Sequence, residues 1–205
     1  MSICTKDLKT FYFKTNIIII TIFIFQNKMP TQFTWMFEKA LEFALKKHKW
    51  QKRKWNNIPY YRHPISVAKN IETYKKSKNI ELLMTAALLH DTVEDCKDVT
   101  VQEIAEKFGY YVAALVDELT SNELEIKKLG KTEYLKNKMA KMSSYWLVIK
   151  LSDRLDNVKD LSTTSENFQK KYIKETLEII EYLESWVRKL TATHKKLIEA
   201  IRNFL

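Results

Sequence analysis

The fold of this chain is decided by residues 80–95, which read IELLMTAALLHDTVED. From Ile80 to Leu89 the stretch is apolar on nearly every side. A helix without a polar face is typical of a protein interior. We therefore predict a buried helix over 80–93, with the pair His90-Asp91 placed where its apolar part stops.

Helical signals continue on both sides of this stretch. Apolar residues recur at helical spacing between Phe33 and Trp50, and Pro64 suits the first turn of a helix. Thr100 and Glu103 match a capping box that opens a helix over 101–108, which Gly109 can end. Further helices are expected at 110–119, 132–142, 147–161, 168–190 and 191–205, and a mobile charged loop is expected at 121–130.

The composition agrees with an all-helical protein. The 205 residues include only two Gly and three Pro, too few for many hairpins or Gly-rich phosphate loops. No segment outside the first 28 residues has the pattern of a strand, and there is no internal repeat. We predict an all-α fold, an irregular multi-helix bundle.

Charge and cysteine content limit the partners. The formal net charge is +10, which favours an anionic partner such as a nucleotide, a nucleic acid or a membrane surface. Because the lysines are scattered through helical patterns, they form a solvated surface, and neither nucleic acid nor stable membrane association is expected. Cys4 and Cys96 do not form a disulfide framework, which indicates a reducing, cytoplasmic location. The oligomeric state stays open.

The first 28 residues differ from the rest. Lysines precede the apolar run NIIIITIFIF at 16–25, but no small-residue cleavage site follows. The run is also too short to span a bilayer as a helix. We predict that residues 1–28 are a dispensable leader, with Met29 as a candidate start, and that residues 29–205 form one domain. A membrane or targeting leader is the alternative.

Four residues of metal-ligand type stand beside core-facing segments. His63 precedes Pro64, His90-Asp91 follows the apolar run, and Asp153 follows a second apolar run at 146–151. Two imidazoles and two carboxylates can hold a divalent metal, and such an ion can turn water into a nucleophile near neutral pH. Each residue also has an ordinary interpretation, as a cap, a polar helix end or an ion pair. Their joint occurrence favours a metal-dependent hydrolase.

The residues after His90 sharpen this hypothesis. If the helix continues, His90 and Glu94 share one face, and so do Asp91 and Asp95. Three crowded carboxylates repel one another unless a cation compensates. Glu94 and Asp95 would then orient or deprotonate the attacking water. A second polar stripe repeats at helical spacing downstream, at Asp153, Asp156, Asn157 and Asp160.

The order His, His-Asp, Asp on helices resembles the HD-domain metal-dependent phosphohydrolases. The flanking segments are more specific and resemble the hydrolase domain of RelA/SpoT homologues. They are PYYRHPISVA at 59–68, AALLHDTVED at 86–95, FG at 108–109 with VAALVDELT at 112–120, and KLSDRLDNVKDL at 150–161. The similarity extends from about residue 33 to about residue 190.

This resemblance implies an activity and a set of roles. Such domains use Mn²⁺ to remove the 3′-pyrophosphate of guanosine tetra- and pentaphosphate, the alarmones of the stringent response. Because synthetase and regulatory domains are absent from the sequence, the chain is similar to the stand-alone small alarmone hydrolases of animals and some bacteria. Carried over by position, the metal ligands would be His63, His90, Asp91 and Asp153. The water would be activated by Glu94 and Asp95, and the substrate would be contacted by Arg53, Lys54, Asn157, Lys128 and Lys131.

Two departures from that pattern leave the nucleotide open. Asp156 stands where the family usually has His or Tyr, and an extra carboxylate near a nucleotide could disfavour a polyanion. The linker 55–58 is shorter and lacks the usual Gly. One alternative is an HD phosphohydrolase of another nucleotide such as NADPH. A second alternative is a catalytically inactive basic helical binding module.

Overall fold

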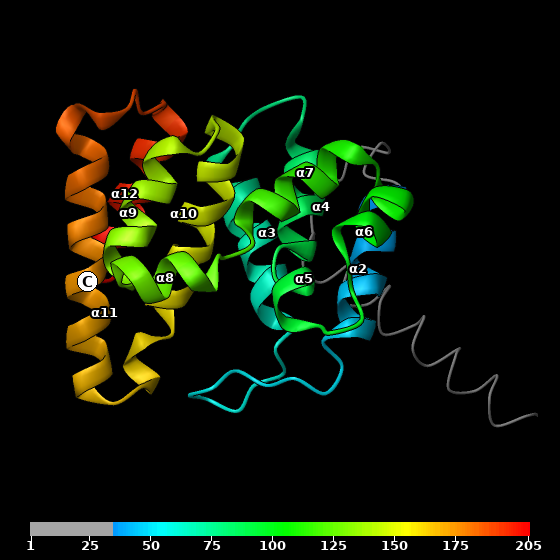
Figure 1. The fold of residues 1–205 in the computed structure, drawn as a ribbon, viewed down its shortest axis with the longest axis horizontal. Helices are drawn as coiled ribbons and strands as arrows, with labels where there is room; N and C mark the ends of the chain where they lie inside the picture. Colours follow the sequence, from blue (N-terminus) through cyan, green and yellow to red (C-terminus); the bar gives the residue numbers. More distant parts are fainter. Residues whose placement is uncertain (1–34) are drawn as a thin grey trace, which may run out of the picture.

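The computed structural model describes residues 35–205, and it is all-helical there, with no strand (Figure 1). The expected all-α bundle is confirmed. The expected leader and its boundary at 28/29 lie outside the described residues. The helices are α2 (Trp35–Lys47), α3 (Arg62–Tyr74), α4 (Ile80–Leu89), α5 (Thr92–Asp95), α6 (Val101–Phe108), α7 (Tyr110–Leu119), α8 (Glu123–Leu129), α9 (Lys131–Lys141), α10 (Ser144–Lys159), α11 (Glu166–Tyr182) and α12 (Ala192–Arg202).

Helix α4 lies at the centre of one half of the bundle. It packs against α2, α3 and α7, and every residue from Leu83 to Leu89 is fully buried. Burying one such Leu or Met side chain stabilises a fold by about 1.5–3 kcal/mol. The apolar run therefore fixes the place of α4 in the core, and with it the position of His90 and Asp91, which follow it.

Helix α10 joins this half to the other. It packs on α3 along one side and on α12 along another. Figure 1 shows α11 at one end of the molecule and α2 and α6 at the opposite end, with α10 and α3 between them. Within the second half, Arg154 on α10 ties α11 in place, because its guanidinium donates to Glu175 Oε1 at 3.0 Å and to Thr176 Oγ1 at 2.9 Å.

The helix predicted over 80–93 is two helices. Helix α4 ends at Leu89, and α5 begins at Thr92. Two side chains take carbonyls at the end of α4: His90 Nδ1 bonds Ala87 O and Thr92 Oγ1 donates to Leu89 O, both at 2.7 Å. Side chains that satisfy the last carbonyls of a helix compete with its continuation. The expected i,i+4 pairing of His90 with Glu94 on one continuous helix was therefore wrong.

The charged loop expected at 121–130 was also wrong, because residues 123–129 form α8. The Asn122 side chain caps this helix by accepting from the backbone N–H groups of Leu124 and Glu125. Gly130, with φ of +80°, ends it and leads directly into α9. The helix predicted over 168–190 starts earlier, at Glu166, and changes into a π-helical turn at Leu183–Val187.

The loop between α2 and α3 is tied at its base. Arg53 N donates to Ile58 O at 2.9 Å, and Lys52 and Pro59 form an isolated bridge. Asn57, at its tip, has φ of 57°, a left-handed conformation that Asn tolerates well. This loop places Arg53, Lys54 and Trp55.

None of the helices between residues 35 and 205 is both long enough and apolar enough to cross a bilayer.

Glu118, near the end of α7, makes stability depend on pH. Burial raises the pKa of its carboxyl from 4.5 to about 7, and its Oε2 has no hydrogen-bond partner among the described residues. Because the folded-state pKa is above the unfolded value, folding retains a proton in this range, and stability falls as pH rises from about 4.5 to 7. We expect Glu118→Gln to raise the free energy of unfolding at pH 8, with a smaller gain at pH 5, measured by urea titration. The exposed Glu106→Gln is the control, and an equal gain for Glu118→Gln at both pH values would contradict the assignment.

Candidate functional site

The metal-type residues come from three helices that pack together. His63 lies in the first turn of α3, His90 and Asp91 lie in the break between α4 and α5, and Asp153 lies in the middle of α10. Since α3 packs on both α4 and α10, these side chains face a common point. Residues far apart in the sequence are thereby brought together.

The cluster has the dimensions of a metal site. His63, His90 and Asp91 each offer one ligand atom, and these atoms all lie within 4.8 Å of one another. Asp91 Oδ2 is 3.6 Å from His63 Nε2 and 3.1 Å from His90 Nε2. Asp153 adjoins the cluster through His63, with Oδ1 at 3.2 Å from His63 Nε2.

His90 is oriented toward the cluster by its backbone contact. Its Nδ1–H donates to Ala87 O, which leaves the lone pair on Nε2. That Nε2 is buried and has no hydrogen-bond partner among the described residues, although Asp91 Oδ2 is near. A buried acceptor without a partner is costly unless something binds it. The fit to a bound cation is good.

His63 is oriented in the same way by a carboxylate. Its Nδ1 lies 2.6 Å from Asp156 Oδ2, so Nδ1–H donates there and Nε2 faces Asp91 and Asp153. Asp156 is also 3.5 Å from the guanidinium of Arg53. Asp156 does not line the cavity described below. The extra carboxylate of this chain therefore contacts a histidine and an arginine.

The electrostatics of the cluster call for added positive charge. Burial lowers the pKa of His63, but its hydrogen bonds with Asp153 and Asp156 outweigh burial and raise the pKa to about 9. Burial likewise opposes the charged form of Asp91, yet the neighbouring His90 holds the pKa of Asp91 below its ordinary range. The buried carboxylates are stabilised by positive charge, which imidazolium protons or a divalent cation can supply. Two imidazole nitrogens and carboxylate oxygens suit a divalent ion of borderline softness.

A cavity of about 490 Å³ opens over this cluster. Nearly all the predicted site residues line it: His63, Asp91, Asp153, Glu94, Asp95, Arg53, Lys54, Asn157 and Lys131. His90 is buried beneath it. Lys128 lines a separate cavity with Lys138 and Lys141.

The predicted water-activating pair lies on the short helix α5 at the rim. Glu94 Oε2 accepts from the backbone N–H of Ser121 at 3.0 Å, which fixes the carboxylate. Burial and the neighbouring Asp91 raise the pKa of Asp95 above its ordinary value. Without a bound cation, Asp95 therefore keeps a proton to higher pH than an ordinary aspartate.

The substrate-contact candidates differ in how free they are. The guanidinium of Arg53 is bound to Asp160 Oδ2 at 3.0 Å, so it braces the loop 51–61 against α10. Asn157 Nδ2 donates to Asp153 Oδ1 at 2.7 Å and so orients a candidate ligand. Lys54 and Lys131 are exposed and line the cavity.

Sequence reasoning missed two polar residues of the site. Lys150 Nζ donates to Asp153 Oδ2 at 2.8 Å, and Tyr60 Oη donates to Asp91 Oδ2 at 2.6 Å. The i,i+3 spacing of Lys150 and Asp153 could have indicated the first pair. Nothing in the sequence links Tyr60 to Asp91, because only the packing of α3 on α4 joins them.

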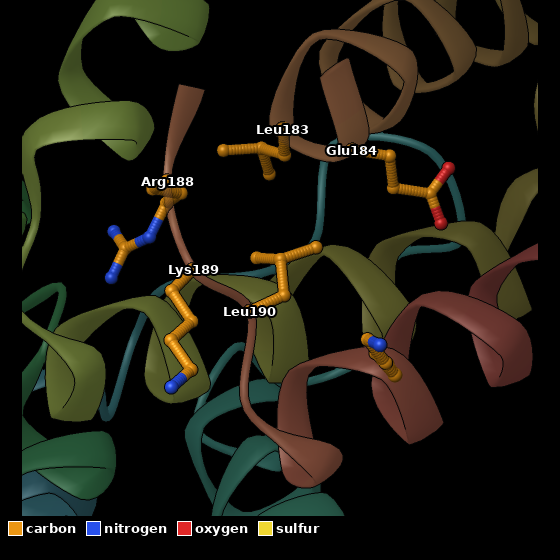
Figure 2. Close-up of a pocket in the computed structure, with 6 residues that line it drawn as sticks. Leu183, Glu184, Arg188, Lys189 and Leu190 are labelled. Carbon is orange, nitrogen blue, oxygen red and sulfur yellow. The ribbon is translucent and has the colours of Figure 1, made fainter. Parts of the chain in front are cut away.

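A larger cavity, of about 830 Å³, lies where α11 ends and α12 begins. Figure 2 shows that the guanidinium of Arg188 points away from Leu183 and Leu190. This guanidinium donates to the carbonyls of Met139 and Met142 and so ends α9. The charged side chains that line this cavity do not point to a common centre. The volume of a cavity alone therefore does not identify the functional site.

Comparisons with known proteins agree with this site. The family model described as "HD domain" matches residues 40–184. A guanosine-3′,5′-bis(diphosphate) 3′-pyrophosphohydrolase of Aquifex aeolicus is 38% identical over 190 residues, which cover 82% of this chain and 25% of that protein. The chain thus spans about a quarter of the length of that relative. The human 3′-pyrophosphohydrolase MESH1 is 34% identical over 167 residues, covering 80% of this chain and 90% of MESH1.

A solved structure has a similar fold. It is a metazoan ortholog of SpoT, described as hydrolysing ppGpp and playing a role in starvation responses. The TM-score is 0.69 at 28% sequence identity, over 86% of this chain and 98% of the other. The HD-domain match covers both histidines, both aspartates and the pair Glu94-Asp95. The expected family is confirmed, and this chain belongs to the HD domain family, in the group that contains the MESH1 proteins.

Proposed function

We propose that this chain is a Mn²⁺-dependent hydrolase that removes the 3′-pyrophosphate of guanosine tetraphosphate, ppGpp, and of the pentaphosphate. The observation that carries the proposal is the buried cluster of two histidines and an aspartate on the floor of a cavity whose rim holds Glu94 and Asp95. The relatives with the names given above support the choice of substrate. A cavity of about 490 Å³ is also of the size that holds small ligands.

The proposed metal ligands are His63, His90, Asp91 and Asp153. Imidazole nitrogens combined with carboxylate oxygens favour Mn²⁺ over Mg²⁺, which prefers oxygen alone. A bound divalent ion supplies a water of lowered pKa and polarises a phosphoryl oxygen. Asp156 orients the imidazole of His63, and Ala87 O orients that of His90, so that both Nε2 atoms face the proposed metal position.

The protein side of the reaction is assigned to the α5 carboxylates. Glu94 takes a proton from the attacking water, whose oxygen forms a bond to the phosphorus next to the ribose 3′-oxygen. The bond between that phosphorus and the 3′-oxygen breaks, and pyrophosphate leaves. Asp95, beside Glu94 on α5, orients that water, and the proton taken up by Glu94 passes to the 3′-oxygen, so the nucleotide product from ppGpp is GDP. Lys54 and Lys131 offset the negative charge of the phosphates.

The direct test is turnover of ppGpp by the full chain with Mn²⁺, followed by anion exchange. We expect GDP and pyrophosphate to appear together and both to be lost on chelation and in Asp153→Ala. Orthophosphate released from NADPH, without pyrophosphate from ppGpp, would move the proposal to another nucleotide. Bound Mn²⁺ with no turnover of either nucleotide would indicate the inactive binding module.

Glu94 and Asp91 have separable roles under this proposal. We expect Glu94→Gln to keep Mn²⁺ bound but to lower kcat by about 10²–10⁴, because a positioned general base contributes that much. Asp91→Asn should lose metal binding itself, because it removes a ligand charge. Bound metal is measured by equilibrium dialysis and kcat by product release. Glu106→Gln on α6 serves as the control, and retained turnover in Glu94→Gln would remove Glu94 from the mechanism.

Asp156 is proposed to act through His63. Removing a carboxylate that orients a metal-binding histidine lowers metal affinity by about 10–100-fold. We expect Asp156→Asn to weaken Mn²⁺ binding by that factor in calorimetry. Asp160→Asn is the matched control, because Asp160 also pairs with Arg53 and is not bonded to His63. Equal losses in the two variants would show that Asp156 acts through Arg53.

A further inference from the structure

Three aromatic side chains line the cavity on the side of the α2–α3 loop and α11. They are Trp55, Phe168 and Tyr172. The ring centroids of Trp55 and Phe168 are 5.4 Å apart, and those of Phe168 and Tyr172 are 5.8 Å apart with planes at 23°. The three rings form a continuous row, hereafter the aromatic row, built from segments more than a hundred residues apart.

Two anchored arginines hold the row at its ends. The Arg53 guanidinium lies 5.2 Å from the Trp55 ring, and the Arg154 guanidinium lies 4.8 Å from the Tyr172 ring. Arg53 is bound to Asp160, and Arg154 is bound to Glu175, so neither cation is free to move away. Cations fixed over ring faces restrict the rings by electrostatic attraction. The row is preorganised before any ligand arrives.

The row starts beside the metal-type cluster. Tyr172 and Asp153 line the same cavity, and the guanidinium of Arg154, also at that cavity, lies over the Tyr172 ring. From Tyr172 the row continues through Phe168, one turn earlier on α11, to Trp55 on the loop. A ligand with one end at Asp153 can therefore lay its other end along the rings.

Core packing accounts for Tyr172 but not for the other two rings. Trp55 and Phe168 are outside the buried core cluster, and Phe168 is 36% exposed. The indole N–H of Trp55 is buried and has no hydrogen-bond partner among the described residues. A Trp that only filled space would normally have this N–H paired. The row therefore offers ring faces to a ligand.

We propose that the aromatic row is the nucleobase site of this enzyme, on which the purine of the substrate stacks while its 3′-pyrophosphate faces the cluster. The proposal rests on the proposed function for the placement of the pyrophosphate. Aromatic faces stack on any base, so the row raises affinity for a purine nucleotide without selecting guanine.

The test compares binding of two fragments of the substrate to the full chain with Mn²⁺. GDP carries the base, and inorganic pyrophosphate carries only the charge. Calorimetry is performed on Phe168→Ala and Trp55→Ala, with Phe204→Ala and Trp50→Ala as matched exposed controls outside the cavity. Trp55→Phe, which keeps a ring, guards against a loop that is disturbed in Trp55→Ala.

Loss of one stacking ring should weaken GDP binding by about 5- to 100-fold and leave pyrophosphate binding within about twofold. Trp55→Phe should recover part of the GDP affinity, and ADP should bind the wild type within a few-fold of GDP. With ppGpp, Phe168→Ala should raise KM and change kcat little, because the ring contacts the base and not the reacting atoms.

Unchanged GDP affinity in both Phe168→Ala and Trp55→Ala would overturn the row as a base site, even if the wild type hydrolyses ppGpp. A parallel loss of GDP and pyrophosphate affinity would overturn it too, because that result means a disturbed fold. If the wild type does not hydrolyse ppGpp but GDP binding still depends on the rings, the base site stands and the proposed reaction fails.

Discussion

The structure depends on one constraint, which is that carboxylates buried between helices need positive charge beside them. Asp91 and Asp153 face His63 and His90 in a space closed by α3, α4 and α10. Buried charge of one sign costs several kcal/mol unless it is paired. The apolar contacts of α4 cannot remove that cost, but they hold His90 and Asp91 near His63, at distances that fit one shared divalent cation. The packing of these helices thus holds the proposed metal site in place before a metal binds.

Three of the four proposed ligands stand out in the sequence because they follow a strong apolar pattern. His90-Asp91 follows a run that is buried on all sides, and Asp153 follows a second buried run. What the periodicity could not show was the break in the helix after Leu89. That break depends on two side-chain hydrogen bonds, from His90 and from Thr92, which compete with the next helical turn. The helix at 123–129 was missed for a similar reason, because its start rests on a local cap at Asn122 and its residues are largely exposed.

The remainder of the site required tertiary structure. Tyr60 with Asp91 and Arg53 with Asp160 are separated by many residues, and no spacing rule relates them. The aromatic row is of the same kind, since Trp55 on a loop meets Phe168 on the first turn of α11. Local patterns predict which residues can be ligands. Long-range packing decides which residues orient them, and that information is absent from periodicity.

Asp156 shows why a substitution in a family pattern must be judged from the contacts that it makes. Seen in sequence, it adds a negative charge near a polyanion. In the structure its carboxylate accepts from His63 and lies beside the buried guanidinium of Arg53, which Asp160 also binds. One guanidinium between two carboxylates leaves one negative charge uncompensated while His63 is neutral, but Asp156 does not line the cavity that a substrate would enter. The guanidinium of Arg53 is already paired with these carboxylates, whereas Lys54 and Lys131 line the cavity as exposed cations without an ion pair among the described residues. The charge that a substrate meets is set by which residues are already paired, so net charge at a site is a poor guide until its ion pairs are known.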